Sequence, residues 1–170
     1  MKYILIILLA FLTACGGGGG SDSSYAFSGD GSKDQPRLLG DSRCVENTYI
    51  SNRNCVGKRK LIDINHLEES YDTTVIALGI NDIQAGVSPA VYKAHLSYLI
   101  ANYDGEIWCV LESTFNYIHP PVTVNAYRQA MLDVCPNTLD PNIDPFNPDK
   151  VHYTDYNYQQ LNDAYLSITD

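Results

Sequence analysis

The sequence has few basic residues. Its 170 residues include 11 Lys and Arg against 20 Asp and Glu, which gives a formal net charge of −9. Nucleic-acid binding depends on basic side chains that neutralise phosphates, so this balance argues against nucleic acid as a partner. It argues equally against electrostatic binding of anionic lipid head groups.

Three other features are absent from the sequence. No apolar run is long enough to span a bilayer, because residues 4–12 fall well short of about 20 residues. The histidines are scattered, without Cys or carboxylate partners at metal-ligand spacing. The glycine run 16–20 precedes no predicted helix, so it is not a phosphate-binding loop. We therefore expect no transmembrane helix, no metal and no cofactor.

The N-terminus is typical of an export signal. Lys2 precedes the apolar residues 4–12, and the segment ends in Leu-Thr-Ala before Cys15. This ending resembles a bacterial lipobox, in which residues 1–14 are removed and Cys15 carries acyl chains such as palmitate. An ordinary signal peptide that contains a cysteine is the alternative. Lipid on Cys15 would anchor the protein to a membrane, and Gly16 after it is typical of outer-membrane lipoproteins that face the periplasm or the surface.

Four cysteines remain after Cys15, and an even number in an exported chain indicates disulfides. Three pairings are possible. We favour Cys44–Cys55 with Cys109–Cys135, because each pair closes a short loop between neighbouring elements. Such a loop would stabilise the fold by roughly 3 kcal/mol. The alternative is four buried thiols.

The composition divides the mature chain into two parts. Residues 15–34 hold the lipidated cysteine and a stretch rich in Gly and Ser, which predicts a flexible tether. Residues 35–170 have the size and the mixed composition of one folded domain.

The pattern of that domain alternates strands and helices, which predicts an α/β fold. The continuous apolar run 73–78 is typical of a buried parallel strand. The other expected strands are 36–39, 47–51 and 106–111. The expected helices are 58–69, one that starts at Pro89 behind the cap Ser88, 125–134, and one that starts at 154 or 155.

Three short motifs carry the functional signal. Gly40-Asp41-Ser42 follows the first strand, Gly79-Ile80-Asn81-Asp82 follows the buried strand, and Asp149-Lys150-Val151-His152 precedes the last helix. The first two lie at the carboxyl ends of parallel strands, where α/β sheets place their sites. This ordered set resembles the SGNH hydrolases, also called the GDSL esterase/lipase family. The resemblance covers most of residues 35–167 and implies a three-layer α/β/α sandwich around a mostly parallel, flavodoxin-like sheet, here in a compact version.

A hydroxyl nucleophile needs a base, and His152 is the candidate for Ser42. Of the four histidines (His66, His95, His119 and His152), His66 and His152 have an acid three residues before them, and only His152 lies just before the last predicted helix. The carboxylate of Asp149 would fix the imidazole tautomer and stabilise the imidazolium, as in other triads. The alternative is a helix cap at Ser42 and a surface Asp–His pair in a proline-rich loop.

The resemblance also implies an oxyanion hole. Asn81 would donate its side-chain amide, while Ser42 and Gly57 would donate backbone N–H groups. Gly57 is the only glycine between Ser42 and Gly79, but the fourteen residues between Ser42 and Gly57 are fewer than the family usually has. Three basic residues follow Gly57, namely Lys58, Arg59 and Lys60. We interpret them as the solvated start of a helix, and the alternative is that they bind an anionic substrate.

The sequence thus predicts a lipid-anchored serine ester hydrolase, expected to be a monomer. Its small size favours acetyl or other small acyl esters, on carbohydrate or lipid, over long acyl chains. A different class is also open: a periplasmic or surface binding lipoprotein that keeps the fold but does not turn over a substrate.

Overall fold

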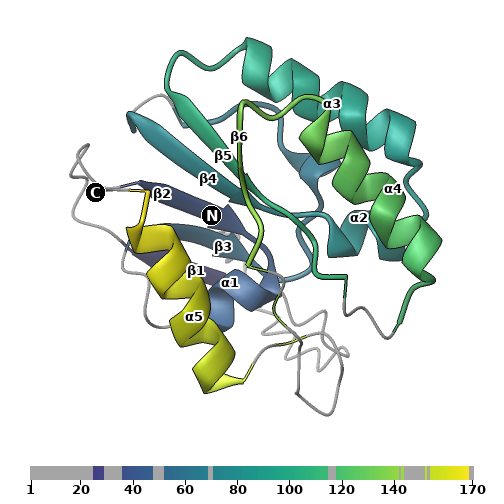
Figure 1. The fold of residues 1–170 in the computed structure, drawn as a ribbon. Helices are drawn as coiled ribbons and strands as arrows, with labels where there is room; N and C mark the ends of the chain where they lie inside the picture. Colours follow the sequence, from purple (N-terminus) through teal and green to yellow (C-terminus); the bar gives the residue numbers. More distant parts are fainter. Residues whose placement is uncertain are drawn as a thin grey trace, which may run out of the picture.

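A six-stranded sheet forms the centre of the molecule (Figure 1). The computed structural model describes residues 25–28, 36–47, 52–68, 71–114, 118–141, 143, 152 and 154–168. The strands are β1 (Tyr25–Ser28), β2 (Arg37–Gly40), β3 (Arg53–Val56), β4 (Thr73–Ala77), β5 (Glu106–Val110) and β6 (Asn137–Leu139). Their order is β1-β3-β2-β4-β5-β6, in which β1 is antiparallel to β3 and the other neighbours are parallel.

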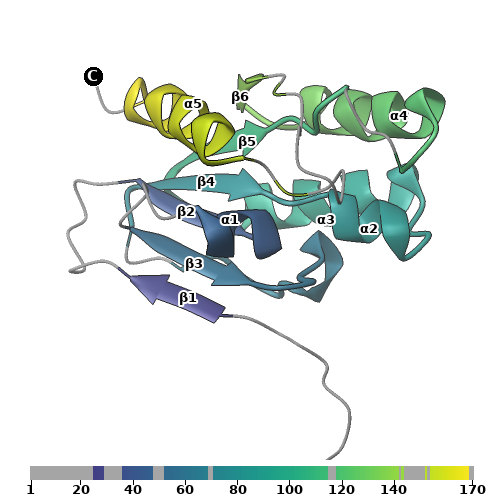
Figure 2. The same cartoon turned by 90° about the horizontal axis from the view of Figure 1, so that it is seen from below.

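Helices cover both faces of this sheet, which confirms the predicted three-layer α/β/α fold (Figure 2). The helical elements are α1 (Ser42–Glu46), the 3-10 helix η1 (Leu61–Asp63), α2 (Ile80–Gln84), α3 (Pro89–Ala101), α4 (Pro121–Leu132) and α5 (Asp155–Leu166). Residues of α3 and α4 pack on one face, and residues of α1 and α5 pack on the other.

The apolar run of β4 is continuous because both of its faces are buried. Ile76 faces the larger core, with Leu96 and Leu99 of α3, while Val75 faces the smaller core, with Tyr165 near the end of α5. Alternate residues of a strand point to opposite faces, so a two-sided sheet needs apolar residues at every position.

Two helices begin where the sequence predicts. The hydroxyl of Ser88 accepts the N–H of Val91, and Pro89 follows as the first residue of α3. Thr154 caps α5 in the same way by accepting the N–H of Asn157. The buried stripe of α5 includes Tyr158 and Leu161.

Several boundaries differ from the sequence-based expectation. The strand expected at 47–51 lies later, at β3, and residues 48–51 lie outside the described part of the chain. The helix expected over 58–69 is only the three-residue η1, because the side chain of Asp82 accepts the N–H groups of Leu61 and Ile62 and holds the segment in a turn. Helix α4 starts at Pro121, four residues earlier than expected.

The stretch that composition assigns to the tether contributes a strand. Residues of β1 pair with all four residues of β3, from Tyr25 opposite Val56 to Ser28 opposite Arg53. Glycine and serine dominate the composition around this segment. A prediction from composition therefore overlooks the short sequence Tyr-Ala-Phe, whose aromatic residues favour a strand.

Other expectations concern residues that the structure does not describe. The export signal 1–14, Cys15 and residues 16–24 are among them, as is Asp149. Within the described ranges, every helix is too short or too polar to traverse a bilayer.

Candidate active site

The proposed nucleophile lies at a tight turn directly behind β2. Ser42 is the first residue of α1, and the side chain of Asp41 caps this helix by accepting the N–H of Arg43 at 3.0 Å. Gly40 must lack a side chain, since a Cβ there would lie 2.3 Å from the Cβ of Cys44. The glycine therefore lets α1 fold back against the end of the strand that precedes it.

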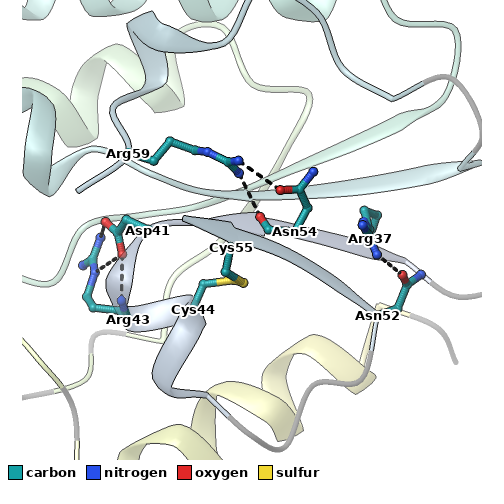
Figure 3. Close-up of a disulfide and its surroundings, with 8 residues drawn as sticks. All are labelled: Arg37, Asp41, Arg43, Cys44, Asn52, Asn54, Cys55 and Arg59. Atoms are coloured by element: carbon teal, nitrogen blue, oxygen red, sulfur yellow. Dashed lines mark hydrogen bonds and ion pairs between the residues drawn. A yellow bond between two sulfur atoms is a disulfide. The ribbon is translucent and has the colours of Figure 1, made fainter. Parts of the chain in front are cut away.

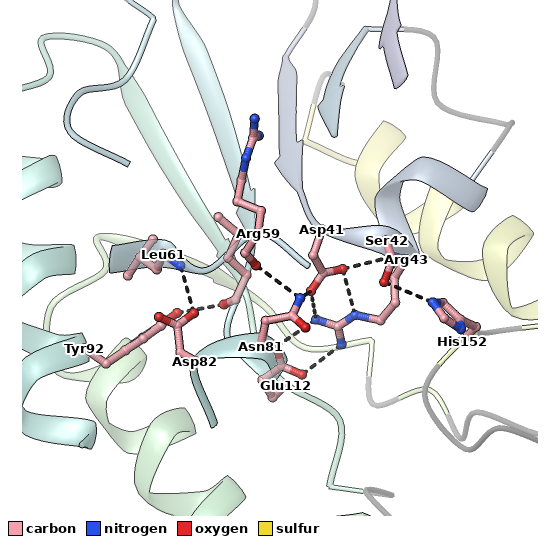
Figure 4. A network of polar contacts seen from close by, with 11 residues as sticks. Asp41, Ser42, Arg43, Arg59, Leu61, Asn81, Asp82, Tyr92, Glu112 and His152 are labelled. Carbon is pink, nitrogen blue, oxygen red and sulfur yellow. Dashed lines mark hydrogen bonds and ion pairs between the residues drawn. The ribbon is translucent and has the colours of Figure 1, made fainter. Parts of the chain in front are cut away.

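The structure brings Ser42 and His152 together although 110 positions separate them (Figure 4). The distance between Ser42 Oγ and His152 Nε2 is 3.0 Å, a hydrogen bond in either direction of proton donation. The imidazole is 24% exposed, so it lies at the surface of the site. Asp149, the predicted orienting carboxylate, lies outside the described residues and its role stays a prediction.

A carboxylate outside the three motifs, that of Glu46, contacts the same imidazole. Glu46 Oε1 is 3.5 Å from His152 Nε2, and the hydroxyl of Tyr158 donates to Glu46 Oε2 at 3.2 Å. Sequence reasoning missed Glu46, although a helical turn after Ser42 places it four residues on, over the same face. It approaches Nε2, the nitrogen that faces Ser42, and so does not substitute for an acid that holds Nδ1.

Asn81 lies at the start of α2, behind the carboxyl end of β4. Its amide nitrogen donates to the carbonyl oxygen of Arg59 at 3.1 Å and to Asp41 Oδ2 at 3.4 Å. The first contact ties Asn81 to the turn after β3, and the second ties it to the nucleophile turn. Both N–H groups of the amide thus have acceptors within the protein.

Gly57 lies in the turn directly after β3, and it is buried. In the sheet register Gly40 pairs with Cys55, so Gly57 and Ser42 follow neighbouring strands at the same edge. The Cys44–Cys55 disulfide joins α1 to β3, the elements that carry Ser42 and lead to Gly57 (Figure 3). The other disulfide joins Cys109 to Cys135, so both pairings agree with the sequence-based expectation.

Two of the three basic residues after Gly57 are bound within the protein, while Lys58 is exposed. The guanidinium of Arg59 donates to the carbonyl oxygen and to Oδ1 of Asn54 at 2.9 and 3.0 Å (Figure 3). Lys60 pairs with Asp63 at 3.2 Å. A cavity of about 300 Å³ opens beside Arg59, and neither Ser42 nor His152 lines it.

The aspartate of the second motif has a structural task. Asp82 is fully buried, and its carboxylate accepts the N–H of Leu61 at 2.8 Å. Burial raises the pKa of this carboxyl, while the two backbone donors of η1 oppose that change. Asp82 therefore fixes the segment whose carbonyl oxygen, on Arg59, holds Asn81.

A charged network joins the ends of two strands in the site (Figure 4). The guanidinium of Arg43 donates to Asp41 at the end of β2 and to Glu112 behind β5. Sequence reasoning missed both Arg43 and Glu112. Glu112 follows its strand as Ser42 and Asn81 follow theirs, and that shared position is the signal that could have found it.

Among the residues that the structure describes, no three His, Cys, Asp or Glu side chains gather as metal ligands would. The groups that do gather are a hydroxyl, an imidazole and amide donors. This set suits nucleophilic attack assisted by a base.

The comparison with solved structures agrees with this architecture. A protein from Streptococcus pneumonia assigned as a platelet activating factor is similar over 80% of this chain and 84% of its own, with a TM-score of 0.63 and 15% identity. A protein from Desulfitobacterium hafniense DCB-2, assigned to the lipolytic G-D-S-L family, is similar over 81% of this chain and 99% of its own, with a TM-score of 0.58 and 15% identity.

A third structure, of a lipolytic G-D-S-L family member from Veillonella parvula DSM 2008, has a TM-score of 0.55 and 14% identity, over 79% of this chain and 97% of its own. No family model matches the chain, and no curated protein matches it. The strand order, the layers and these neighbours together show that the chain has the α/β fold of the lipolytic G-D-S-L proteins, the SGNH hydrolases.

Proposed function

We propose that this protein is a serine ester hydrolase held at a membrane by lipid on Cys15. The observation that carries the proposal is the 3.0 Å contact between Ser42 Oγ and His152 Nε2. An alcohol and an imidazole at this distance, at the carboxyl edge of a parallel sheet, are the minimum for acyl transfer by a serine. The lipolytic assignment of two structural neighbours supports the same reaction class.

The reaction has two halves. His152 Nε2 takes the Ser42 proton while Oγ attacks the ester carbonyl carbon, and the imidazolium then gives that proton to the departing alcohol. Water then attacks the acyl carbon on Ser42 while His152 takes its proton, and the imidazolium returns that proton to Ser42 Oγ as the second tetrahedral intermediate collapses and releases the acid. Asp149 holds the imidazole in the required tautomer.

Amide donors stabilise the oxyanion in both halves. The proposed donors are the backbone N–H groups of Ser42 and Gly57 and the side chain of Asn81. One such donor contributes roughly 3–4 kcal/mol in the transition state. The Asn81 contact to Asp41, at 3.4 Å, is the longer of its two and the one that the oxyanion would replace.

The proposed substrates are acetyl and other small acyl esters on carbohydrate or lipid. The helix that begins at Ser42 spans five residues, and the described segments around it are short, which leaves little of the described chain to cover a long acyl group. Comparing nitrophenyl acetate with a long-chain nitrophenyl ester tests the preference, and faster turnover of the long chain would contradict it.

The decisive experiment compares the purified full chain with Ser42→Ala and His152→Ala. Ester hydrolysis should fall by roughly a thousandfold or more in Ser42→Ala, since nucleophile and base act as one unit. Circular dichroism checks that each variant folds. Equal rates in the parent and in Ser42→Ala would refute the hydrolase.

A second function, a binding lipoprotein without turnover, is favoured by one observation. Both N–H groups of the Asn81 amide have acceptors inside the protein, which leaves the oxyanion one donor fewer in this arrangement. Tight binding of an ester without Ser42-dependent release of acid would support it.

A further inference from the structure

Arg43 directly follows the proposed nucleophile, yet its charge is directed into the protein. Its side chain is only 11% exposed and lies between two carboxylates (Figure 4). Any effect of Arg43 on catalysis rests on the ester hydrolysis proposed for Ser42, in which Asn81 helps to hold the oxyanion. Within that reaction, a residue that need not touch the substrate can still set the geometry of the oxyanion hole.

The guanidinium binds each carboxylate with two hydrogen bonds. Nε and Nη2 donate to Oδ1 and Oδ2 of Asp41 at 3.2 and 3.0 Å. Nη1 and Nη2 donate to Oε2 and Oε1 of Glu112 at 2.8 and 2.9 Å. Only a planar fork can engage two carboxylates in this way, and a lysine ammonium cannot.

This double fork connects the ends of two strands that flank a third. Asp41 follows β2, Glu112 follows β5, and the strand between them, β4, leads to Asn81. Glu112 also lies against Gly79, because a Cβ built at that glycine would be 2.8 Å from Glu112 Oε1. Arg43 therefore restrains both neighbours of the turn that presents Asn81.

Arg43 and Asn81 share one acceptor atom. Asp41 Oδ2 accepts from Arg43 Nη2 at 3.0 Å and from Asn81 Nδ2 at 3.4 Å. The shorter bond belongs to the charged donor, which weakens the hold of Asp41 on the Asn81 amide. Without Arg43, an unpaired carboxylate would bind that N–H more tightly and compete with the oxyanion.

The charge of Arg43, like its hydrogen bonds, favours an oxyanion beside Asn81. Asp41 is fully buried and Glu112 is 3% exposed, so the field of two unpaired carboxylates would be poorly screened by water. A new negative oxygen beside Asn81 would be repelled by both. The single positive charge of the guanidinium offsets one of the two negative charges, and because it is delocalised it is shared between Asp41 and Glu112.

We propose that Arg43 is a positioning residue for ester hydrolysis: by binding Asp41 and Glu112 it keeps the Asn81 amide available to the oxyanion and offsets the carboxylates beside it. Its role is exerted through Asn81 in the transition state. The expected signature is a change in kcat with little change in KM.

The test uses Arg43→Lys in the full chain, with Arg37→Lys as the matched control. Arg37 is at the other end of β2, where its side chain is 10% exposed and bonds to Asn52. With nitrophenyl acetate, kcat of Arg43→Lys should fall about 10- to 100-fold at nearly constant KM. Arg37→Lys should keep a kcat within about twofold of the parent, even where its urea midpoint drops.

A second comparison separates charge from packing. Arg43→Met leaves two unpaired carboxylates, and adding Glu112→Gln removes one of them. The double variant should recover part of the lost kcat if charge compensation matters, whereas a packing role predicts a double variant no better than the single one. Urea unfolding of each variant reports the folded fraction. If Arg43→Met does not fold, the kcat of Arg43→Lys alone tests the positioning role.

The two proposals fail in different ways. A parent chain without Ser42-dependent hydrolysis would end both. A parent with such hydrolysis, in which Arg43→Lys matches Arg37→Lys in kcat, would overturn only the role of Arg43. A loss confined to KM or to the urea midpoint would overturn it as well.

Discussion

At the scale of single residues, the site depends on side chains that are absent as much as on those present. Gly79 begins the second motif, and its missing Cβ leaves the space that the carboxylate of Glu112 fills. Its φ of 156° adds a backbone conformation that other residues rarely adopt. One glycine thus serves both the turn toward Asn81 and the network around Arg43.

Gly79→Ala should lower both stability and activity. The new Cβ would lie 2.8 Å from Glu112 Oε1, so the free energy of unfolding should fall by about 2–4 kcal/mol, and kcat should fall with it. Gly86→Ala is the matched control, because Gly86 also has a positive φ (71°) but no atom within 4 Å of a new Cβ. Urea unfolding and ester assays measure both effects. Equal losses in the two variants would contradict the steric argument.

Tyr127→Phe should change stability at high pH. Tyr127 is 1% exposed and donates to the carbonyl of Val87, and burial, with the charge of Asp82, raises its pKa from 10.0 to about 12. The unfolded chain therefore loses this proton first, and stability falls as pH rises from 10 to 12.

Urea unfolding across that pH range measures the effect. The decline should be shallower in Tyr127→Phe than in the parent. Tyr98→Phe, a change at an exposed tyrosine of α3, should leave the slope as it is. A parent and a Tyr127→Phe variant with the same slope would show that this phenol ionises alike in both states.

At the scale of elements, the most regular segments were predictable. The apolar run of β4 and the Ser88-Pro89 start of α3 follow from burial and capping, which are local properties. The helix expected over 58–69 is absent for a distant reason, since Asp82 captures the N–H groups of η1 from 20 or more positions away. Such tertiary hydrogen bonds leave no periodic trace in the sequence.

The same distinction holds within the site. Ser42, Asn81 and His152 are carried by motifs, so their types and order could be read directly from the sequence. Arg43 and Glu112 are 69 positions apart, and only the adjacency of β4 with β2 and β5 brings them into contact. Pairing between distant charged residues requires the sheet order, which one sequence does not supply.

The two disulfides should differ in function although both stabilise. Each closes a loop, with sequence separations of 11 and 26, so removing either should lower the free energy of unfolding by about 3 kcal/mol. Of the two, only Cys44–Cys55 joins the helix of Ser42 to β3, the strand that leads to Gly57. Replacing that pair by serine should also reduce kcat, while replacing Cys109 and Cys135 should leave kcat of the folded protein nearly unchanged. Similar kcat values in the two variants would rule out a bracing role for Cys44–Cys55.

At the scale of the whole molecule, the sheet separates two hydrophobic cores of different size. The core shared by the sheet with α3 and α4 is the larger and contains Leu78 and Leu111, while the smaller one lies under α1 and α5. The proposed nucleophile and the proposed base both sit on the smaller side, at the start of α1 and just before α5. Their approach therefore depends on how α5 docks, which Tyr158 and Tyr165 support through bonds to Glu46 and Pro36.

Cys15→Ser should release the protein from membranes. Acyl chains on Cys15 are the proposed anchor, and the acidic chain has no electrostatic substitute for them. In bacteria that express the full chain, the parent should fractionate with membranes and the serine variant should fractionate with soluble protein. Mass spectrometry of the N-terminal peptide provides the direct check. Unchanged membrane association of the variant would exclude lipid on Cys15 as the anchor.

Strand β1 determines where the N-terminal end of the folded domain lies relative to the candidate site. Because β1 is antiparallel to β3, its first residue, Tyr25, lies opposite Val56, at the edge of the sheet where β2 ends at Gly40 and Ser42 follows. Nine residues, 16–24, separate the proposed lipid anchor at Cys15 from Tyr25, and a flexible coil of nine residues reaches roughly 16 Å. With the proposed lipid on Cys15, so short a tether would keep Ser42 near the bilayer, and esters carried by the same membrane would reach the proposed nucleophile before esters from the surrounding medium.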